Sequence, residues 1–349
     1  AMYSTADITV TPRPIYCADG RKLPDVWTNP SNWRDELRSE IGDFPLFHFW
    51  GPAADIRSTE WIARATMMTV AKFDPTLTLV YLPHLDYALQ KFGPADPRIR
   101  SELREIDGVF AALLKFFDDR GIRVSVLSEY GISPVAGAVH LNRVLRDAGF
   151  LTLRNELGRE MLDAGASRAF AVCDHQVAHI YVAHERDRSE VQRILQATAG
   201  VEMVLDAQGK HAAGLDHPRA GDLVAISKAD SWFAYPWWND DARAPDFART
   251  VDIHRKPGYD PCELFLDPKI RFAKGRIAWR LFQRKLGMRV LLDVIPLDAS
   301  LVRGSHGRVE MAHARRPLMM VDDGDNDDLE VRACDVMPFL MRQIFGRDG

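Results

Sequence analysis

Hydrophobic and polar positions follow two different periods along this chain, and their alternation predicts an α/β protein. Apolar residues recur with helical spacing over 97–119 and again over 141–148. Residues 122–128 (IRVSVLS) and the earlier run 76–83 are rich in strand-forming side chains, so we expect a strand at each. The segment from 76 to 148 is therefore predicted to run β-α-β-α.

The second half of the chain continues this alternation. Residues 169–182 and 201–206 are predicted strands that flank a helix near 188–198. The runs GDLVAIS (221–227) and DSWFAYPWW (230–238) predict a further pair of strands. A basic amphipathic helix is expected over 268–287, followed by a long loop.

The organisation is predicted to be a single α/β domain over 1–349, with two segments set apart. Residues 1–45 are rich in Pro and short turns, so we expect an extended connection with a short helix from Trp33 to Ile41. A candidate cap or insertion lies at about 150–215. The acidic run DDGDNDD at 322–328 is interpreted as a solvated loop; calcium binding is the alternative, but the run lacks the spacing of an EF-hand.

Composition and charge favour a small ligand. The chain has 349 residues, of which 46% are hydrophobic and 27% charged, and its net charge is −4. Because Lys and Arg alternate with Asp and Glu, neither a nucleic acid polymer nor a membrane surface is expected as the partner. We therefore expect a small ligand, and a homo-oligomer remains open.

The cysteines point to a reducing compartment. The four cysteines are far apart and form no CxxC pair, which argues against a zinc ribbon or a disulfide framework. The start AMYSTADITV has neither the basic nor the apolar region of a secretory signal, and no run approaches the length of a membrane span. A cytoplasmic location is therefore the expectation.

Three places carry polar side chains that could serve as ligands. Asp86 lies in LPHLDYALQKFGP, Glu129 in LSEYGI and His306 in RGSHG. Taken singly, Asp86 is also explained as a helix cap or turn residue, and His306 as a loop residue. It is their order along the chain that favours a common site.

That order resembles the type I phosphodiesterase and nucleotide pyrophosphatase branch of the alkaline phosphatase superfamily. In this family a metal-binding Asp is followed four residues later by His and then by a GP turn; here DYALQKFGP begins at Asp86. The family's Ser-Asp-His-Gly is matched by SEYG, which includes Glu129 and Tyr130, and its Gly-x-His-Gly by GSHG, which includes His306. The late runs GDLVAISKADSWF and EVRACDVMPFLMRQIFG resemble the family as well.

The resemblance implies a fold, an activity and a cofactor. The fold would be an alkaline-phosphatase-like three-layer αβα sandwich with a central, mainly parallel sheet that lacks its N-terminal elements. The activity would be hydrolysis of phosphodiester, pyrophosphate or phosphonate bonds with one or two divalent metal ions. Asp86 and His306 would hold one ion and Glu129 would contribute to the other.

The sequence departs from the family at three of these ligand positions. Gln90 stands where the family has His, Tyr130 also replaces a His, and Glu129 replaces the usual Asp. Oxygen-rich ligands favour Mn or Mg over Zn, although Zn also remains open, and one ion could have been lost. Gln90 and Tyr130 are therefore interpreted as metal ligands or as residues that support the ligands.

Four further residues are candidates for the same site. His84 would share the face of Asp86 on a regular strand and could supply the missing nitrogen, because positions two apart point the same way. His254, in VDIHRKPGYDP, is a candidate ligand together with Asp260; the alternative for His254 is a loop residue beside a Pro-Gly turn. His175 in CDHQVAHIYV, like Asp260, is a candidate for the substrate pocket, and a structural role at a sheet edge is its alternative.

The residues before Asp86 suggest no nucleophile. The family's nucleophile is a metal-bound Thr or Ser on an N-terminal element, and we expect it, with the first metal-binding Asp, to lie upstream of this chain, which would then be impaired on its own. The alternative is a catalytically lapsed member that binds a phosphorylated ligand or a partner protein through the same cleft. A third hypothesis is phosphoryl transfer between hydroxyls.

Overall fold

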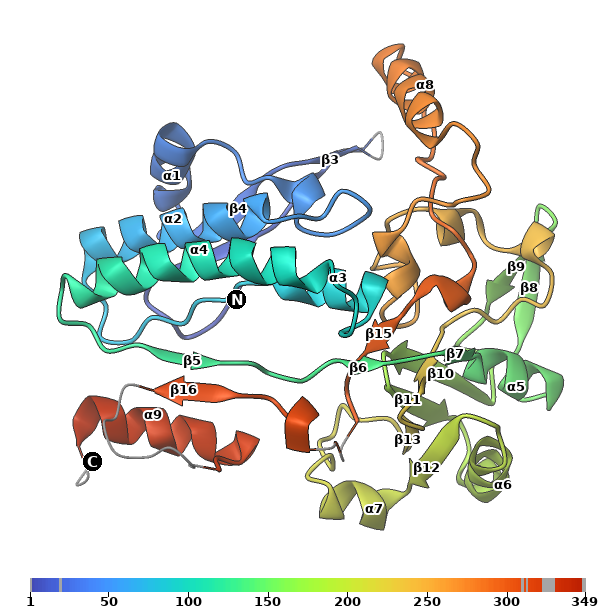
Figure 1. Cartoon of the computed structure of the whole chain (residues 1–349). Helices are drawn as coiled ribbons and strands as arrows, with labels where there is room; N and C mark the ends of the chain where they lie inside the picture. Colours follow the sequence, from blue (N-terminus) through green and yellow to red (C-terminus); the bar gives the residue numbers. More distant parts are fainter. Residues whose placement is uncertain (1, 19–20, 309–310, 312, 322–329, 347–349) are drawn as a thin grey trace.

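The structure is a computed structural model that describes residues 2–18, 21–308, 311, 313–321 and 330–346 (Figure 1). The acidic run 322–328 lies outside these residues. The helices are α1 (Trp33–Ile41), α2 (Arg57–Phe73), α3 (His84–Phe92), α4 (Ile99–Asp118), α5 (Leu141–Asp147), α6 (Glu185–Gln196), α7 (Ala207–Ala212), α8 (Ala273–Lys285) and α9 (Val336–Phe345). The strands are β1 (Thr9–Pro12), β2 (Ile15–Tyr16), β3 (Lys22–Leu23), β4 (Val26–Asn29), β5 (Ser125–Leu127), β6 (Ser133–Pro134), β7 (Gly137–Val139), β8 (Leu153–Glu156), β9 (Arg159–Leu162), β10 (Ala169–Asp174), β11 (Val177–Val182), β12 (Val201–Leu205), β13 (Leu223–Ser227), β14 (Ser231–Phe233), β15 (Gly304–Ser305) and β16 (Met319–Val321).

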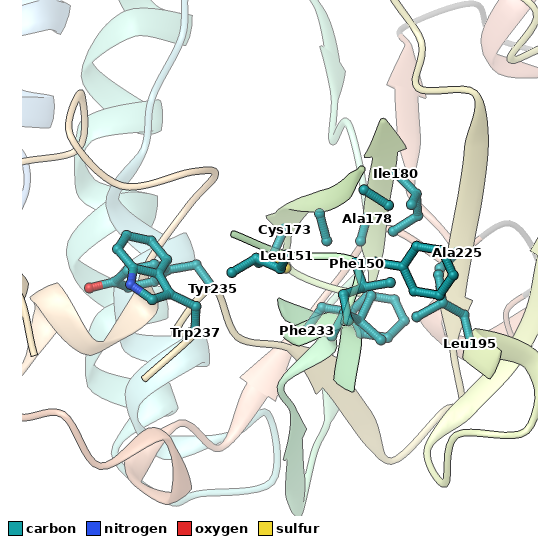
Figure 2. Packing of buried hydrophobic residues seen from close by; sticks show 14 of the residues in the cluster. Phe150, Leu151, Cys173, Ala178, Ile180, Leu195, Ala225, Phe233, Tyr235 and Trp237 are labelled. Carbon is teal, nitrogen blue, oxygen red and sulfur yellow. The ribbon is translucent and has the colours of Figure 1, made fainter. Parts of the chain in front are cut away.

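The main hydrophobic core lies on a four-stranded sheet. Its strand order is β10-β11-β13-β12, and α5 and α6 pack against it. Alternate residues of β10 are buried, as expected for a strand with one face on the core, and every residue of β13 is buried. Figure 2 shows this core around Phe150, Ile180 and Leu195. The aromatic run 230–238 lies largely inside the protein, where Trp237 and Trp238 are core residues.

The predicted α/β class is confirmed, but the strands pair differently from the expected central, mainly parallel sheet. Among the described residues the strands form separate small sheets, and the pair β7 and β14 is the parallel one. In the four-stranded sheet every pair is antiparallel. The reason is local, because β10 and β11 are joined by a two-residue turn at His175 and Gln176, which forces them to run in opposite directions.

The run 76–83, predicted as a strand, has no regular secondary structure. Leu79 is 78% exposed and Tyr81 53% exposed, whereas Leu82 packs against the hydrophobic cluster between α2 and α4. Strand propensity expresses how well a side chain fits a half-buried sheet, and none of the described strands pairs with this run. The helix α3 instead begins at His84, directly after Pro83.

Several other predicted elements are confirmed within a few residues. The helix expected over 97–119 is α4, and that over 141–148 is α5. The predicted helix near 188–198 is α6, and the basic helix over 268–287 is the shorter α8. The strands expected at 122–128 and at 221–227 are β5 and β13.

The N-terminal region contains paired strands as well as the expected helix α1. Strand β1 pairs with β4, and β2 with β3. Trp33 and Leu37 of α1 pack with Trp61 of α2 in a hydrophobic cluster of their own. Farther along, segment 150–215 supplies β10, β11 and β12, so it shares its largest sheet with β13 from outside the segment.

The chain near the C-terminus returns to α3 through β15. This strand pairs with β6, and Gly304 lies so close to α3 that a Cβ atom there would be 2.2 Å from the carbonyl oxygen of Leu89 and 2.9 Å from the side chain of Ile132. The residue before it, Arg303, donates its backbone N–H to the carbonyl of Gln90 over 2.9 Å. A side chain at Gly304 would therefore push β15 away from α3.

We expect Gly304→Ala to lower the free energy of unfolding by roughly 1–3 kcal/mol, because overpacking a close contact costs that much. Urea denaturation followed by circular dichroism measures the change. Gly108→Ala is the matched control: it lies on the exposed side of α4 with no atom within 4 Å of the new Cβ. The control should raise stability by about 1 kcal/mol through helix propensity. Equal stability of Gly304→Ala and the parent chain would contradict the expectation.

Candidate functional site

Helix α3 places Asp86 and Gln90 on one face. The two residues are four apart, so their side chains lie one above the other. Gln90 Nε2 donates to Asp86 Oδ2 over 2.8 Å. Gln90 is fully buried, and its Oε1 has no hydrogen-bond partner among the described residues. The two residues thus lie on successive turns of α3, with the amide of Gln90 serving as a donor to the carboxylate.

The loop after β5 brings a second donor to the same carboxylate. The hydroxyl of Tyr130 donates to Asp86 Oδ1 over 3.2 Å. The neighbouring Glu129 is exposed, yet its charge reaches Asp86 and raises the pKa of that residue. Both oxygens of Asp86 are therefore held by donors from two different segments.

His306 reaches the cluster from the residue after β15. Its Nε2 lies 3.9 Å from Asp86 Oδ1. Its ring stacks on that of Tyr130, with 3.6 Å between the ring centroids and 4° between the planes. The backbone N–H of Gln176 donates to the carbonyl of His306 over 2.8 Å, which fixes the loop. The segments that carry Asp86, Tyr130 and His306 thus meet, whereas Glu129, the third predicted ligand, has an exposed side chain.

The ring of His175 lies next to that of His306, so Tyr130, His306 and His175 form a row of three rings. His175 lies in the tight turn between β10 and β11 with φ of 56°, a left-handed conformation that is uncommon for a residue with a side chain. Its ring centroid is 3.9 Å from that of His306 and 5.5 Å from that of Tyr259. The ring is buried, and its Nδ1 has no hydrogen-bond partner in the part of the chain described. Residues in such strained turns often serve a function.

Burial keeps both imidazoles of this row neutral. It lowers the pKa of His306 to about 4. Burial also lowers the pKa of His175 well below its usual value, and His306 lowers it further. Neutral imidazole is the form that binds metal ions.

Burial shifts the pKa of the Asp86 carboxylate upward, in the direction opposite to the shift of the histidines. Burial raises the pKa of Asp86, and the charges of Glu129 and Asp174 raise it further, whereas the hydrogen bonds from Gln90 and Tyr130 lower it. Asp174 itself is largely exposed, with 60% of its side chain accessible to solvent. Two carboxylates, Glu129 and Asp174, thus oppose the negative charge of Asp86.

Burial and the nearby carboxylates also raise the pKa values of two tyrosines at the site. Burial, followed by the charges of Asp86 and Glu129, raises the pKa of Tyr81 to about 12. Burial, followed by Asp86 and Asp174, raises that of Tyr259 to about 12. Sequence reasoning missed both residues. Tyr259 carries no signal in the sequence, and Tyr81 was assigned to a strand that does not form.

The residues present fit a divalent cation. The site offers a buried carboxylate at Asp86, two neutral imidazoles at His306 and His175, and the unpartnered Oε1 of Gln90. All are ligand types found in metal sites. A cation would also offset the mutual repulsion of Asp86, Glu129 and Asp174.

His84 lies on the opposite side of α3 from Asp86, in contrast to the expected shared face. The expectation assumed a strand, in which residues two apart point the same way. On a helix two residues are separated by about 200°, so the two side chains diverge. His84 Nε2 instead lies 3.0 Å from a carboxylate oxygen of Glu102 on α4.

The contacts of His254 and Asp260 are with residues other than Asp86 and His306. His254 is exposed, and its ring centroid lies 6.3 Å from that of Tyr16. Asp260 is buried, forms an ion pair of 2.7 Å with the buried Lys256 and accepts from the backbone N–H of Cys262. A ligand role for His254 and a pocket role for Asp260 remain predictions.

Comparisons with known proteins identify a family and several solved structures that resemble this chain. A family model described as type I phosphodiesterase / nucleotide pyrophosphatase matches residues 1–260. The solved structures that resemble it include phosphonoacetate hydrolase from Sinorhizobium meliloti in complex with phosphonoformate, at 19% identity over 54% of this chain and 44% of that chain, with a TM-score of 0.37. Murine ectonucleotide pyrophosphatase / phosphodiesterase 5 matches at 19% identity over 51% of this chain and 45% of that chain, with a TM-score of 0.38.

The chain thus matches less than half the length of these two proteins. The comparison with curated proteins gives no match. Among the described residues, none of the helices is both long and apolar enough to cross a membrane.

We expect His306 to titrate with a pKa of about 4, and His175 far below its usual value, when the chain is free of metal ions. The unfolded chain binds the same protons near pH 6.5, so the contribution of His306 to stability is lost as the pH falls from about 6.5 to about 4. Nuclear magnetic resonance of labelled histidine, assigned with His→Gln variants, measures both values. His211, whose pKa is raised by its hydrogen bond to Asp216, is the internal control. Titration of His306 at or above pH 6.5 would contradict the burial argument.

Proposed function

This chain belongs to the type I phosphodiesterase / nucleotide pyrophosphatase family, and from that membership we propose that it is a metal-dependent hydrolase of phosphodiester, pyrophosphate or phosphonate bonds. The observation that carries the proposal is the convergence on Asp86 of groups from α3, the loop after β5 and the residue after β15. These are the three segments whose motifs resemble the metal-binding segments of the family.

We assign the metal-holding role to Asp86, His306 and Glu129, with His175 close enough to His306 to contribute. A bound divalent ion would stabilise the charge that develops on phosphoryl oxygens during displacement. Gln90 and Tyr130 hold the Asp86 carboxylate in a fixed orientation and favour its ionised form through their hydrogen bonds. Burial keeps the His306 ring unprotonated, and therefore able to bind, at neutral pH.

The protonated hydroxyls of Tyr81 and Tyr259 border the same site. Because their pKa values are raised to about 12, both remain hydrogen-bond donors at neutral pH. We propose that they face the oxygens of a small phosphorylated substrate. Carboxylate-rich surroundings favour Mn or Mg, and the two imidazoles keep Zn among the candidates.

A second candidate function has support from the hydrogen bonds of Asp86. Gln90 and Tyr130 replace two family histidines, and in the structure both side chains donate to Asp86 instead of offering an imidazole. This arrangement would suit a catalytically lapsed member that binds a phosphorylated ligand through the same cleft. Cation binding together with substrate turnover distinguishes the two functions.

We expect the chain to bind Mn²⁺ or Zn²⁺, and we expect the protein encoded by the full reading frame to hydrolyse bis-p-nitrophenyl phosphate in a cation-dependent manner. Asp86→Asn should lower kcat/KM by more than about a hundredfold, because even residues that merely contact metal ligands contribute 10–100-fold. Release of p-nitrophenol and isothermal titration with each cation provide the measurements. Asp119→Asn, at an exposed Lys115 ion pair on the last turn of α4, is the matched control and should behave as the parent chain.

Three outcomes of this experiment are distinct. Cation-dependent turnover that Asp86→Asn abolishes supports the hydrolase. Cation binding that Asp86→Asn weakens, without turnover of any phosphodiester, pyrophosphate or phosphonate by the protein of the full reading frame, supports the lapsed binding protein. Binding and turnover that are equal in Asp86→Asn and in the parent chain contradict a role for Asp86 in either function.

Gln90→His provides an independent test of the metal site. The variant restores the imidazole that the family carries at this position, and the buried residue already faces Asp86. We expect the affinity for Zn²⁺ to rise by about tenfold or more, because imidazole is the better ligand for this ion. Isothermal titration measures the gain, with Gln283→His on α8 as the control. An unchanged or weaker affinity of Gln90→His would place the cation away from residue 90.

A further inference from the structure

A second cluster of ligand-type side chains lies between α3 and α4. His84 occupies the first turn of α3, and Glu102 and Glu105 lie on α4. The two glutamates are three residues apart, so they share one face of their helix. The ligand atoms of the three residues all lie within 4.8 Å of one another.

The distances within this cluster match those around a tetrahedral ion. His84 Nε2 lies 3.0 Å from Glu102 Oε2 and 3.6 Å from Glu105 Oε2. Ligands bound at about 2.0–2.1 Å in tetrahedral geometry are separated by about 3.3–3.4 Å. A small adjustment of the two flexible glutamate side chains would therefore place all three atoms around one ion.

The imidazole of His84 is an independent sign that the cluster binds a ligand. The residue is only 2% exposed, and neither ring nitrogen has a hydrogen-bond partner among the described residues. Burying a polar group without such a partner is costly. Although Nε2 is close to the Glu102 carboxylate, no well-aligned hydrogen bond forms there. Coordination to a cation would satisfy Nε2, while Nδ1 would remain unpartnered.

We propose that His84, Glu102 and Glu105 form a binding site for a divalent transition-metal ion, Zn²⁺ above all, that joins α3 to α4. One nitrogen and two carboxylate oxygens are a ligand set that Zn²⁺ accepts, with water at the fourth position. The side chain of Glu105 is 48% exposed, which gives an ion a path from solvent. Glu102 also interacts with the ammonium group of Lys91, the cation on α3 that faces it.

This site is separate from the one at Asp86, because the side chains of His84 and Asp86 lie on opposite sides of α3. It extends the proposed function without depending on it. A cation held here would fix the first turn of α3 against α4 and so position Asp86 and Gln90 on the other face. We therefore assign it a structural role, in which binding of the ion adds to the stability of the folded chain.

The test uses the full chain with Asp86→Asn, so that binding at the other site does not obscure the result. Isothermal titration with Zn²⁺ alone should show one equivalent bound, and saturating Zn²⁺ should raise Tm. Adding Glu105→Gln should weaken this binding at least tenfold and abolish the rise in Tm. The exposure of Glu105 makes this variant suitable, since His84→Ala removes a buried side chain and could disturb folding.

Glu190→Gln in the same background is the matched control. Its carboxylate is 49% exposed and pairs with Arg193 on α6. This control should bind Zn²⁺ as the Asp86→Asn chain does. Absence of Zn²⁺ binding in the Asp86→Asn chain would overturn the proposal, as would equal affinities of the Glu105→Gln and Glu190→Gln chains. Neither result would alter the expectations for cation binding and turnover by the chain with Asp86 intact.

Discussion

The close packing of the β15 backbone against α3 is the contact on which the candidate site depends. Gly304 leaves no room for a side chain beside the Leu89 carbonyl, and Arg303 donates to the carbonyl of Gln90. These backbone contacts set the distance between α3 and the segment that carries His306. Because the Gln176 N–H also binds the His306 carbonyl, the turn between β10 and β11 is tied to the same point. Segments more than a hundred residues apart in the sequence thus meet through the main chain.

Helix α3 shows how far the sequence could predict this site. The four-residue spacing of Asp86 and Gln90, and the GSHG run with His306, indicated correctly which segments converge. The predicted face of His84 was wrong. The apolar residues before Pro83 have the pattern of a strand, and residues two apart on a strand point to the same face. With the helix beginning at His84, the period becomes 3.6 and His84 turns toward α4.

The contacts through which other residues reach the site could not be predicted from the sequence, even for His175, which was a pocket candidate. His175 reaches His306 because a two-residue turn between β10 and β11 adopts a left-handed conformation, and a polar turn residue alone does not reveal that. Tyr259 borders the site through tertiary packing in a loop. The antiparallel pairing of the four-stranded sheet likewise depends on turn length, whereas the expectation of a mainly parallel sheet came from the family resemblance. Long-range contacts of this kind are decided by packing, which local periodicity does not encode.

The stacked rings of Tyr130, His306 and His175 have a consequence for ligand binding. With neighbours at 3.6 Å and 3.9 Å, the imidazole of His306 has little freedom to rotate. A side chain that is already immobile loses little conformational entropy when it binds, so more of the interaction energy remains as affinity. The row of rings therefore preorganises the site, and a substitution that loosens the stack would weaken binding even though it leaves every ligand atom in place.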